Sequence, residues 1–315
     1  MSTTSSSASQ IRFEVHDYDL AATLSSGQAF RWNLRDEYWE SVIHGHWVRL
    51  LSTEKEILAE TAEPIENWSW LANYLQFGLN FKNILATFPD DEPMRAAVSS
   101  CCGLRLLRQD PWECLASFIL SSTKQIVQIE QIVGSLCERF GEPVPVPPGR
   151  PPAYSFPTAA RLAECSEADL RACKMGFRAA YLKNSAAMIA ASEVSLANLL
   201  GLDLEQARQE LLKLPGVGRK IADCVLLFAY GFPKAFPIDV WVMKALCKLY
   251  FRGRRIPLQR LQRFSEDHFG PFAGFAQQYL FHYMRKQQKR TTVKMLPNAL
   301  SVPETGLSRD DSSSP

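Results

Sequence analysis

Lys220 and Asp239 are the residues whose types and spacing best suit chemistry. Lys220 follows Leu214-Pro-Gly-Val-Gly218, and Asp239 lies in Pro237-Ile-Asp-Val240. The positive end of a helix dipole disfavours an ammonium ion, so a lysine in a first helical turn is a suitable amine nucleophile. A carboxylate nearby would stabilise positive charge on the substrate. Together they predict amine chemistry on a DNA sugar, whereas Lys220 alone could be a solvated lysine or a phosphate contact.

Two helices joined by a tight turn must position this lysine. Asp203 is a suitable N-cap for the first helix, and the second begins near Arg219, so we expect a helix-hairpin-helix over about residues 203–230. Glycines in the turn allow a phosphate to approach the free N–H groups at the start of the second helix. The turn consists of Gly216, Val217 and Gly218.

Asp239 precedes a helical sequence that begins at Val240, so it is also a candidate N-cap. The structural and chemical interpretations of Asp239 are compatible. A cap would hold the carboxylate in the orientation that the chemistry uses.

In its motifs the chain resembles the helix-hairpin-helix DNA glycosylase superfamily, and within it the 8-oxoguanine DNA glycosylases. The resemblance extends from about Gly27 to about Arg285. It implies an enzyme of base-excision repair that flips 8-oxoguanine out of duplex DNA and excises it. Besides the two segments around Lys220 and Asp239, the matching motifs are Arg105–Pro111, Ser117–Ile119, Gly27-Gln28 with Phe30–Trp32, and Gly176–Arg178.

The resemblance also implies a mechanism. Lys220 would attack C1′ of the flipped nucleoside and displace the base, while Asp239 would stabilise the cationic sugar and help to move protons. The resulting Schiff base would permit β-elimination of the 3′ phosphate. The enzyme would therefore be a bifunctional DNA glycosylase and abasic-site (AP) lyase.

The same resemblance implies a lesion pocket. Phe281 would stack on the base and Gln277 would bind it, and the i, i+4 spacing puts both on one helical face. Gly27 would present its carbonyl to the N7–H group of the oxidised base, a hydrogen that guanine lacks. The structural alternative for Gly27 is a turn that enters a strand at Ala29–Trp32. Cys224 lies on an apolar helical stripe, so packing is an equal alternative for it. Phe281 alone would suit a core position.

Further residues would contact DNA around the lesion. By resemblance, Phe177 is the wedge and Arg178 contacts the estranged cytosine, although an exposed helix-surface pair is the alternative. Thr123 stands where the family has an asparagine that fills the vacated space. Gln128 stands where the family has a second arginine that contacts the cytosine opposite the lesion. The resemblance therefore does not imply a strict preference for cytosine at that position. Trp241 replaces a histidine that contacts phosphate.

Composition and pattern predict an α+β protein of 315 residues. Alternating residues such as Tyr38–Leu50 indicate an N-terminal antiparallel sheet, and helical periods dominate from Trp112 onwards. Lys244 to Arg290 contains eleven basic residues against two acids, which suits DNA or a merely solvated surface. The expected divisions are residues 1–10 disordered, 11–111 an α/β subdomain, 112–290 the helical glycosylase domain, and 291–315 a disordered tail.

The eight cysteines lack CxxC spacing, which favours reduced intracellular thiols. The last is Cys247, so the iron–sulfur cluster of related endonuclease III enzymes is not expected, and no cofactor or metal is required. Family resemblance allows a monovalent cation at the hairpin and suggests a monomer. No apolar run of membrane-spanning length occurs. We expect a DNA-associated protein, in the nucleus of a eukaryote or the cytoplasm of a bacterium.

Two alternative functions stay open at this point. One is a monofunctional glycosylase for alkylated bases, which would need Asp239 but not Lys220. The other is a non-enzymatic hairpin protein that only binds DNA, which would need neither this pair nor a pocket.

Overall fold

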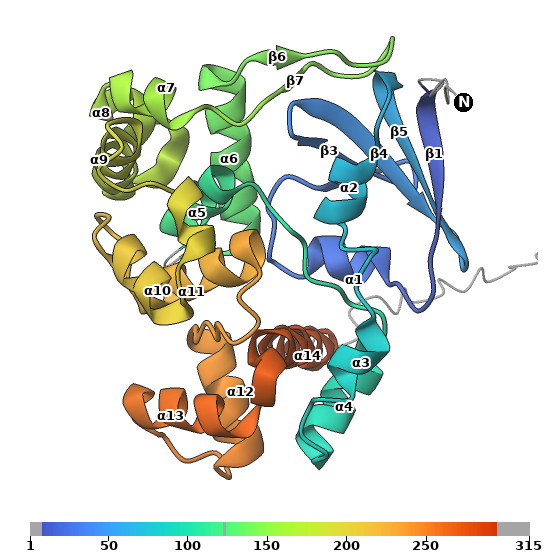
Figure 1. The fold of residues 1–315 in the computed structure, drawn as a ribbon, viewed down its shortest axis with the longest axis vertical. Coiled ribbons are helices and arrows are strands. Elements are labelled where there is room, and N and C mark those ends of the chain that lie inside the picture. Colours follow the sequence, from blue (N-terminus) through green and yellow to red (C-terminus); the bar gives the residue numbers. More distant parts are fainter. Residues whose placement is uncertain (1–7, 122–123, 295–315) are drawn as a thin grey trace, which may run out of the picture.

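The computed structural model describes residues 8–121 and 124–294. Its N-terminal part is a five-stranded antiparallel sheet in the order β1-β5-β4-β3-β2, which confirms the predicted sheet (Figure 1). His44 and Gly45 both have positive φ in the turn between β3 and β4, as a tight two-residue hairpin requires. The strands are β1 (Ala8–Glu14), β2 (Asn33–Arg35), β3 (Tyr38–Ile43), β4 (His46–Ser52) and β5 (Glu56–Ile65).

The segment around Gly27 differs from the expectation. A short helix, α1 (Leu20–Ser25), precedes it, and β2 begins only at Asn33, so the strand expected at Ala29–Trp32 is wrong. The physical reason is the buried Gln28 side chain, which donates to the carbonyls of Thr23 and Arg105 and accepts from the Leu107 N–H. These long-range bonds hold an irregular backbone where the pattern predicts a strand.

Two expected boundaries also shift. β1 begins at Ala8, within the segment expected to be disordered, and the last helix continues to Lys294, beyond the expected boundary at 290. The Pro-rich segment Pro143–Pro157 contains a small two-stranded sheet formed by β6 (Pro143–Val144) and β7 (Ala153–Tyr154).

The remainder of the described chain is mainly helical, as the periodicity predicts. Helices α2 (Ser69–Tyr74), α3 (Phe81–Leu85) and α4 (Glu92–Ser100) follow the sheet. The helical domain contains α5 (Pro111–Ser121), α6 (Ile126–Phe140), α7 (Ala159–Glu164), α8 (Glu167–Leu170), α9 (Arg178–Ala190), α10 (Leu204–Leu212), α11 (Arg219–Val225), α12 (Val240–Tyr250), α13 (Leu258–His268) and α14 (Ala273–Lys294). Short 3₁₀ or π turns occupy Arg171–Met175, Ala197–Gly201, Leu226–Tyr230 and Gly270–Phe272.

Two hydrophobic cores stabilise these parts. The smaller core packs sheet residues such as Val48 and Leu50 against α2, and the larger one fills the helical domain. Helix α1 contributes to both, since Leu24 belongs to the sheet core and Ala22 to the helical core. The segment before Gly27 is therefore anchored on both sides.

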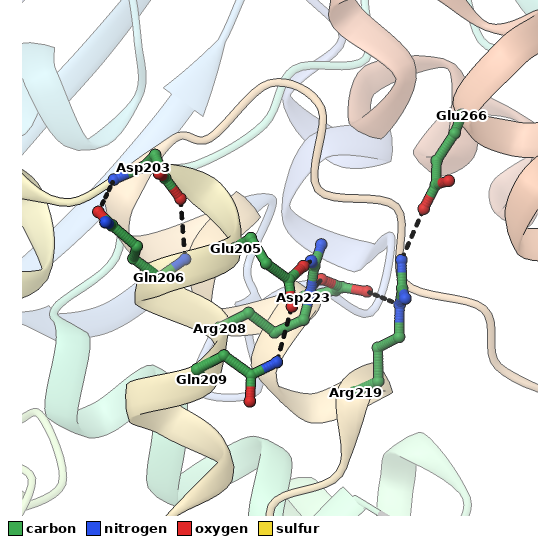
Figure 2. Close-up of polar contacts among 8 residues, drawn as sticks. All are labelled: Asp203, Glu205, Gln206, Arg208, Gln209, Arg219, Asp223 and Glu266. Atoms are coloured by element: carbon green, nitrogen blue, oxygen red, sulfur yellow. Dashed lines mark hydrogen bonds and ion pairs between the residues drawn. The ribbon is translucent and has the colours of Figure 1, made fainter.

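Helices α10 and α11 form the predicted helix-hairpin-helix and are joined by a buried ion pair. Asp203 caps α10, and Arg208 of α10 donates to Asp223 of α11 at 2.8 Å (Figure 2). Both side chains are buried, at 6% and 2% exposure. Arg219, at the start of α11, also binds Glu266 of α13 at 2.8 Å. These contacts fix α11, and with it Lys220, to two neighbouring helices.

Replacing Arg208 with alanine should lower the free energy of unfolding by about 3 kcal/mol, because it leaves the Asp223 carboxylate buried without its main partner. Urea unfolding monitored by circular dichroism measures this loss. Lys213→Ala, which removes an exposed pair with Glu210, is the matched control and should cost less than about 1 kcal/mol. Equal losses in both variants would contradict a structural role for the buried pair.

Candidate active site

The six residues predicted for catalysis and lesion binding line one cavity. Its volume is about 850 Å³, and it lies where the Gly27 segment meets α5, α6, α11, α12 and α14. The residues come from distant parts of the chain. They are Gly27, Lys220, Cys224, Asp239, Gln277 and Phe281.

Lys220 is half-buried in the first turn of α11. Its amine donates to the Ser121 hydroxyl at 3.1 Å and lies 5.0 Å from the centre of the Phe118 ring. Ser121 in turn donates to the Phe118 carbonyl at 2.7 Å, so its oxygen is oriented to accept from the lysine. The amine is thus held at the cavity wall by a neutral partner.

Asp239 caps α12, as predicted, and accepts from the Val242 N–H at 2.8 Å. Burial raises the pKa of its carboxyl above the usual range, and the hydrogen bond from Val242 and the charge of Lys220 oppose this only in part. Among the ion pairs of the described residues, none joins Lys220 to Asp239. The amine and the carboxylate share the cavity without being locked together.

Cys224 combines the two roles considered for it. Its side chain is buried on the apolar face of α11 and also lines the cavity. Burial raises the pKa of its thiol to about 12, so the group stays protonated at neutral pH. Cys224 therefore offers a neutral surface beside Lys220.

Gln277 and Phe281 lie one helical turn apart on α14. Gln277 is only 3% exposed, and its Oε1 has no hydrogen-bond partner among the described residues. An unpaired buried acceptor is costly, so this oxygen suits a ligand that donates an N–H. The Phe281 ring, also buried, supplies an apolar surface in the same cavity.

Gly27 has φ of +82°, a conformation that L side chains rarely adopt. A Cβ at this position would come within 2.6 Å of the Ile126 side chain and 3.5 Å of the Phe281 ring. Only glycine fits between these side chains without strain. The backbone of Gly27 can therefore be reached by a flat ligand lying on Phe281.

The hairpin turn has the geometry expected of a close backbone approach. Gly216 has φ of +78°, and a Cβ there would clash with the Tyr181 ring at 2.7 Å. Gly218 is the N-cap of α11, whose first N–H groups lack helical partners. Val217 differs, because its side chain is buried and its N–H donates to the Leu214 carbonyl. The Val217 N–H is therefore not available at this turn.

Phe177 and Arg178 are not the exposed pair considered for these positions. Phe177 is 57% exposed, but Arg178 is only 6% exposed and its guanidinium lies 4.5 Å from the centre of the Phe177 ring. The aromatic ring covers the charge, and burial lowers the pKa of the guanidinium. The Arg178 guanidinium is therefore not presented to solvent as an exposed helix-surface group.

The three departures from the family pattern have different outcomes. Gln128 is engaged in a capping box of α6, where its Oε1 accepts from the Gln125 N–H at 3.0 Å, so its side chain is held at the start of that helix. Trp241 lies at the cavity, with the Lys244 amine 5.1 Å from its ring centre. Thr123 lies outside the residues that the structure describes.

Family comparisons agree with this geometry. Residues 10–115 match the N-terminal domain of 8-oxoguanine DNA glycosylase, and residues 116–269 match the HhH-GPD superfamily of base-excision DNA repair proteins. A probable N-glycosylase/DNA lyase from Methanothermobacter thermautotrophicus is 31% identical over 219 residues, which cover 64% of this chain and 69% of that protein. The chain belongs to the 8-oxoguanine DNA glycosylase family.

Solved structures resemble the whole fold of this glycosylase. MBOgg1 in complex with a low-affinity DNA ligand superposes with a TM-score of 0.85 at 30% identity, covering 90% of this chain and 98% of that one. The Clostridium acetobutylicum 8-oxoguanine glycosylase/lyase, bound to double-stranded DNA with cytosine opposite 8-oxoG, has a TM-score of 0.82 at 30% identity, covering 88% and 98%. The predicted fold and the enzyme class, a DNA glycosylase with lyase activity, are confirmed.

Sequence reasoning missed two cavity residues of this glycosylase, Ser121 and Arg285. Ser121 ends the predicted helical segment after the Ser117–Ile119 motif, where a small polar residue facing a lysine on another helix has no local signal. Arg285 does have one, because it continues the i, i+4 series of Gln277 and Phe281 on α14. A charged side chain on the helical face that carries Gln277 and Phe281 is the sequence signal that could have placed Arg285 in the cavity.

Ser121→Ala should slow covalent trapping on abasic-site DNA by about fivefold, because the Lys220 amine loses one net hydrogen bond of about 1 kcal/mol. Borohydride trapping under single-turnover conditions measures the rate.

Ser265→Ala is the matched control for this change. Its buried hydroxyl also donates to a carbonyl three residues earlier at 2.7 Å, but on α13. An equal rate loss in both variants would show that Ser121 acts only through general stability.

Proposed function

We propose that this enzyme excises 8-oxoguanine from duplex DNA through a Schiff base on Lys220 and then cleaves the strand by β-elimination. The observation that carries the proposal is the convergence of an amine, a carboxylate, an unpaired amide oxygen and an aromatic face on one cavity. The 8-oxoguanine glycosylase/lyase of Clostridium acetobutylicum has the same fold, which supports this choice of substrate.

In the proposed reaction, the neutral Lys220 amine attacks C1′ of the flipped nucleoside, and the base departs with the bonding electrons. Ser121 orients this amine. Ionised Asp239 stabilises the positive charge at C1′ and accepts a proton from the lysine nitrogen. Opening of the sugar gives the Schiff base. Loss of the C2′ proton then expels the 3′ phosphate.

The lesion is proposed to lie on Phe281, between Gln277 and Gly27. The unpaired Gln277 oxygen would accept an N–H from the Watson–Crick edge of the base. The Gly27 carbonyl would accept N7–H, which is present in 8-oxoguanine, while it would repel the N7 lone pair of guanine. Because both contacts are desolvated, the site can discriminate strongly between the two bases.

The DNA backbone is proposed to bind at the hairpin through Gly216 and the N–H groups that begin α11, without reading base sequence. Phe177 would insert at the lesion, and Arg178 and Gln128 would approach the opposite base. The enzyme would act on DNA as a monomer. The carbonyls of Leu214 and Pro215 each accept one hydrogen bond and keep a second lone pair, so they would suit a monovalent cation at the hairpin.

The proposed activity is tested with duplexes that carry 8-oxoguanine opposite each of the four bases, together with an alkylated-base duplex. Base release and borohydride trapping are followed for each. A trapped adduct on 8-oxoguanine supports the proposal, and the opposite-base pattern reports on Gln128. Release of alkylated bases alone, without trapping, would favour a monofunctional glycosylase.

In the described residues, no helix is long and apolar enough to cross a bilayer.

Lys220→Gln should reduce trapping by at least about 1,000-fold, because the amide cannot form the Schiff base. Affinity for a duplex with an abasic-site analogue should be largely retained. Lys82→Gln, on the exposed surface of α3, is the control for loss of one charge. Loss of DNA binding together with trapping would withdraw support from Lys220 as the nucleophile.

The rate of 8-oxoguanine excision should fall with decreasing pH at a pKa above the ordinary aspartate range, which is about 3.9. Asp239 acts ionised, and burial raises its pKa, so its function is present above this raised pKa and is lost as pH falls through it. Single-turnover rates measured against pH give the acid limb.

The control for this profile is Asp239→Asn, which should be slow and should lack the same limb. Circular dichroism at each pH verifies that the fold persists. An unchanged acid limb in Asp239→Asn would assign the titration to another group.

A further inference from the structure

Arg285 is the feature of the cavity that the proposed mechanism leaves unused. It lies on α14 and lines the cavity with Gln277 and Phe281. Its guanidinium lies 5.4 Å from the centre of the Phe281 ring, and one of its terminal nitrogens is 3.2 Å from the position that a Cβ on Gly27 would occupy. The charge therefore sits beside both surfaces assigned to the flipped base.

The donors of Arg285 are not used within the part of the chain that the structure describes. Among the described residues, the guanidinium forms no hydrogen bond or ion pair. Burial lowers its pKa, and the charges of Asp239 and Glu130 oppose this only in part. A guanidinium has five N–H donors and no acceptor. A half-buried group of this kind is suited to a ligand that presents acceptor oxygens.

The order of residues along α14 indicates which end of the base Arg285 meets. Gln277, Phe281 and Arg285 follow one another at intervals of four residues, so they span about 12 Å on one helical face. A purine that lies on Phe281 with its Watson–Crick edge at Gln277 directs its opposite end, which carries C8, towards Arg285. Gly27, assigned to the adjacent N7, lies at that same end.

We infer that Arg285 is a specificity-determining residue that donates a hydrogen bond to O8 of the lesion. The inference rests on the proposed function and adds a second contact to the one made by Gly27. Guanine has a C–H at this position, which offers nothing to a guanidinium. The site would thus favour purine lesions that carry an oxygen acceptor at C8.

The test is the affinity of Arg285→Leu for three duplexes. Two contain 8-oxoguanine or 8-oxoadenine on a 2′-fluorinated sugar that resists excision, and the third contains a tetrahydrofuran abasic analogue. Both 8-oxopurines carry O8, but 8-oxoadenine has an amino group in place of O6. Fluorescence anisotropy at fixed salt should show both 8-oxopurines weakened by about 10- to 100-fold and the abasic analogue unchanged.

Each other result would overturn the inference in a recognisable way. Weaker binding of 8-oxoguanine alone would assign the contact to O6, and weaker binding of the abasic analogue would assign it to the DNA backbone. Unchanged affinities would show that Arg285 has no role in recognition.

Controls separate this inference from folding and from the proposed function. Lys82→Leu removes one exposed charge and should leave all three affinities unchanged. Trapping of abasic-site DNA by Arg285→Leu verifies the fold, and Arg285→Gln provides the same test if the leucine variant does not fold. Failure of the wild-type enzyme to excise ordinary 8-oxoguanine would refute the proposed function. Normal excision with unchanged affinities in Arg285→Leu would refute only the role of Arg285.

Discussion

The site depends on the packing of α14, which joins the N-terminal part of the chain to the rest of the helical domain. Tyr279 is fully buried and donates to the Leu104 carbonyl, while Gln278 donates to the carbonyl of Ser26, beside Gly27. The same helix packs against α4 and α12 and is drawn between α12 and α3 in Figure 1. It therefore sets the separation between the Gly27 backbone and Gln277, and so the shape of the cavity. Neither half of the chain could form the cavity alone.

Within this frame, the charged groups of the site are kept apart by neutral partners. Lys220 is held by Ser121, and Asp239 by the backbone at the start of α12. A direct ion pair would tie the amine and the carboxylate to each other and keep both away from the substrate. The buried ion pair of the hairpin, between Arg208 and Asp223 (Figure 2), is not part of the cavity lining. On the same hairpin, the Arg208–Asp223 pair stabilises the fold, while Lys220 faces the cavity.

The predictions that held were those encoded by local contacts. The caps Asp203 and Asp239, the turn at Gly216 and the alternating Tyr38–Leu50 segment each depend on residues a few positions apart. The strand expected at Ala29–Trp32 failed because Gln28 bonds to the distant segment 105–107, and the burial of Arg178 has no signal in the local sequence. Family resemblance could name the residues of the cavity, but not Ser121 beside the lysine, whose role arises only from helix packing. Local patterns do not contain such long-range contacts.

The position of Phe177 over Arg178 has a consequence for the order of events on DNA. In the free protein, the ring is exposed and the guanidinium lies beneath it. A duplex that displaces the ring would uncover the charge, so intercalation would come before the partner base is inspected. The enzyme would then inspect the partner base only after the DNA duplex has been opened. On intact DNA, Arg178 would stay covered and would make no contact with the bases.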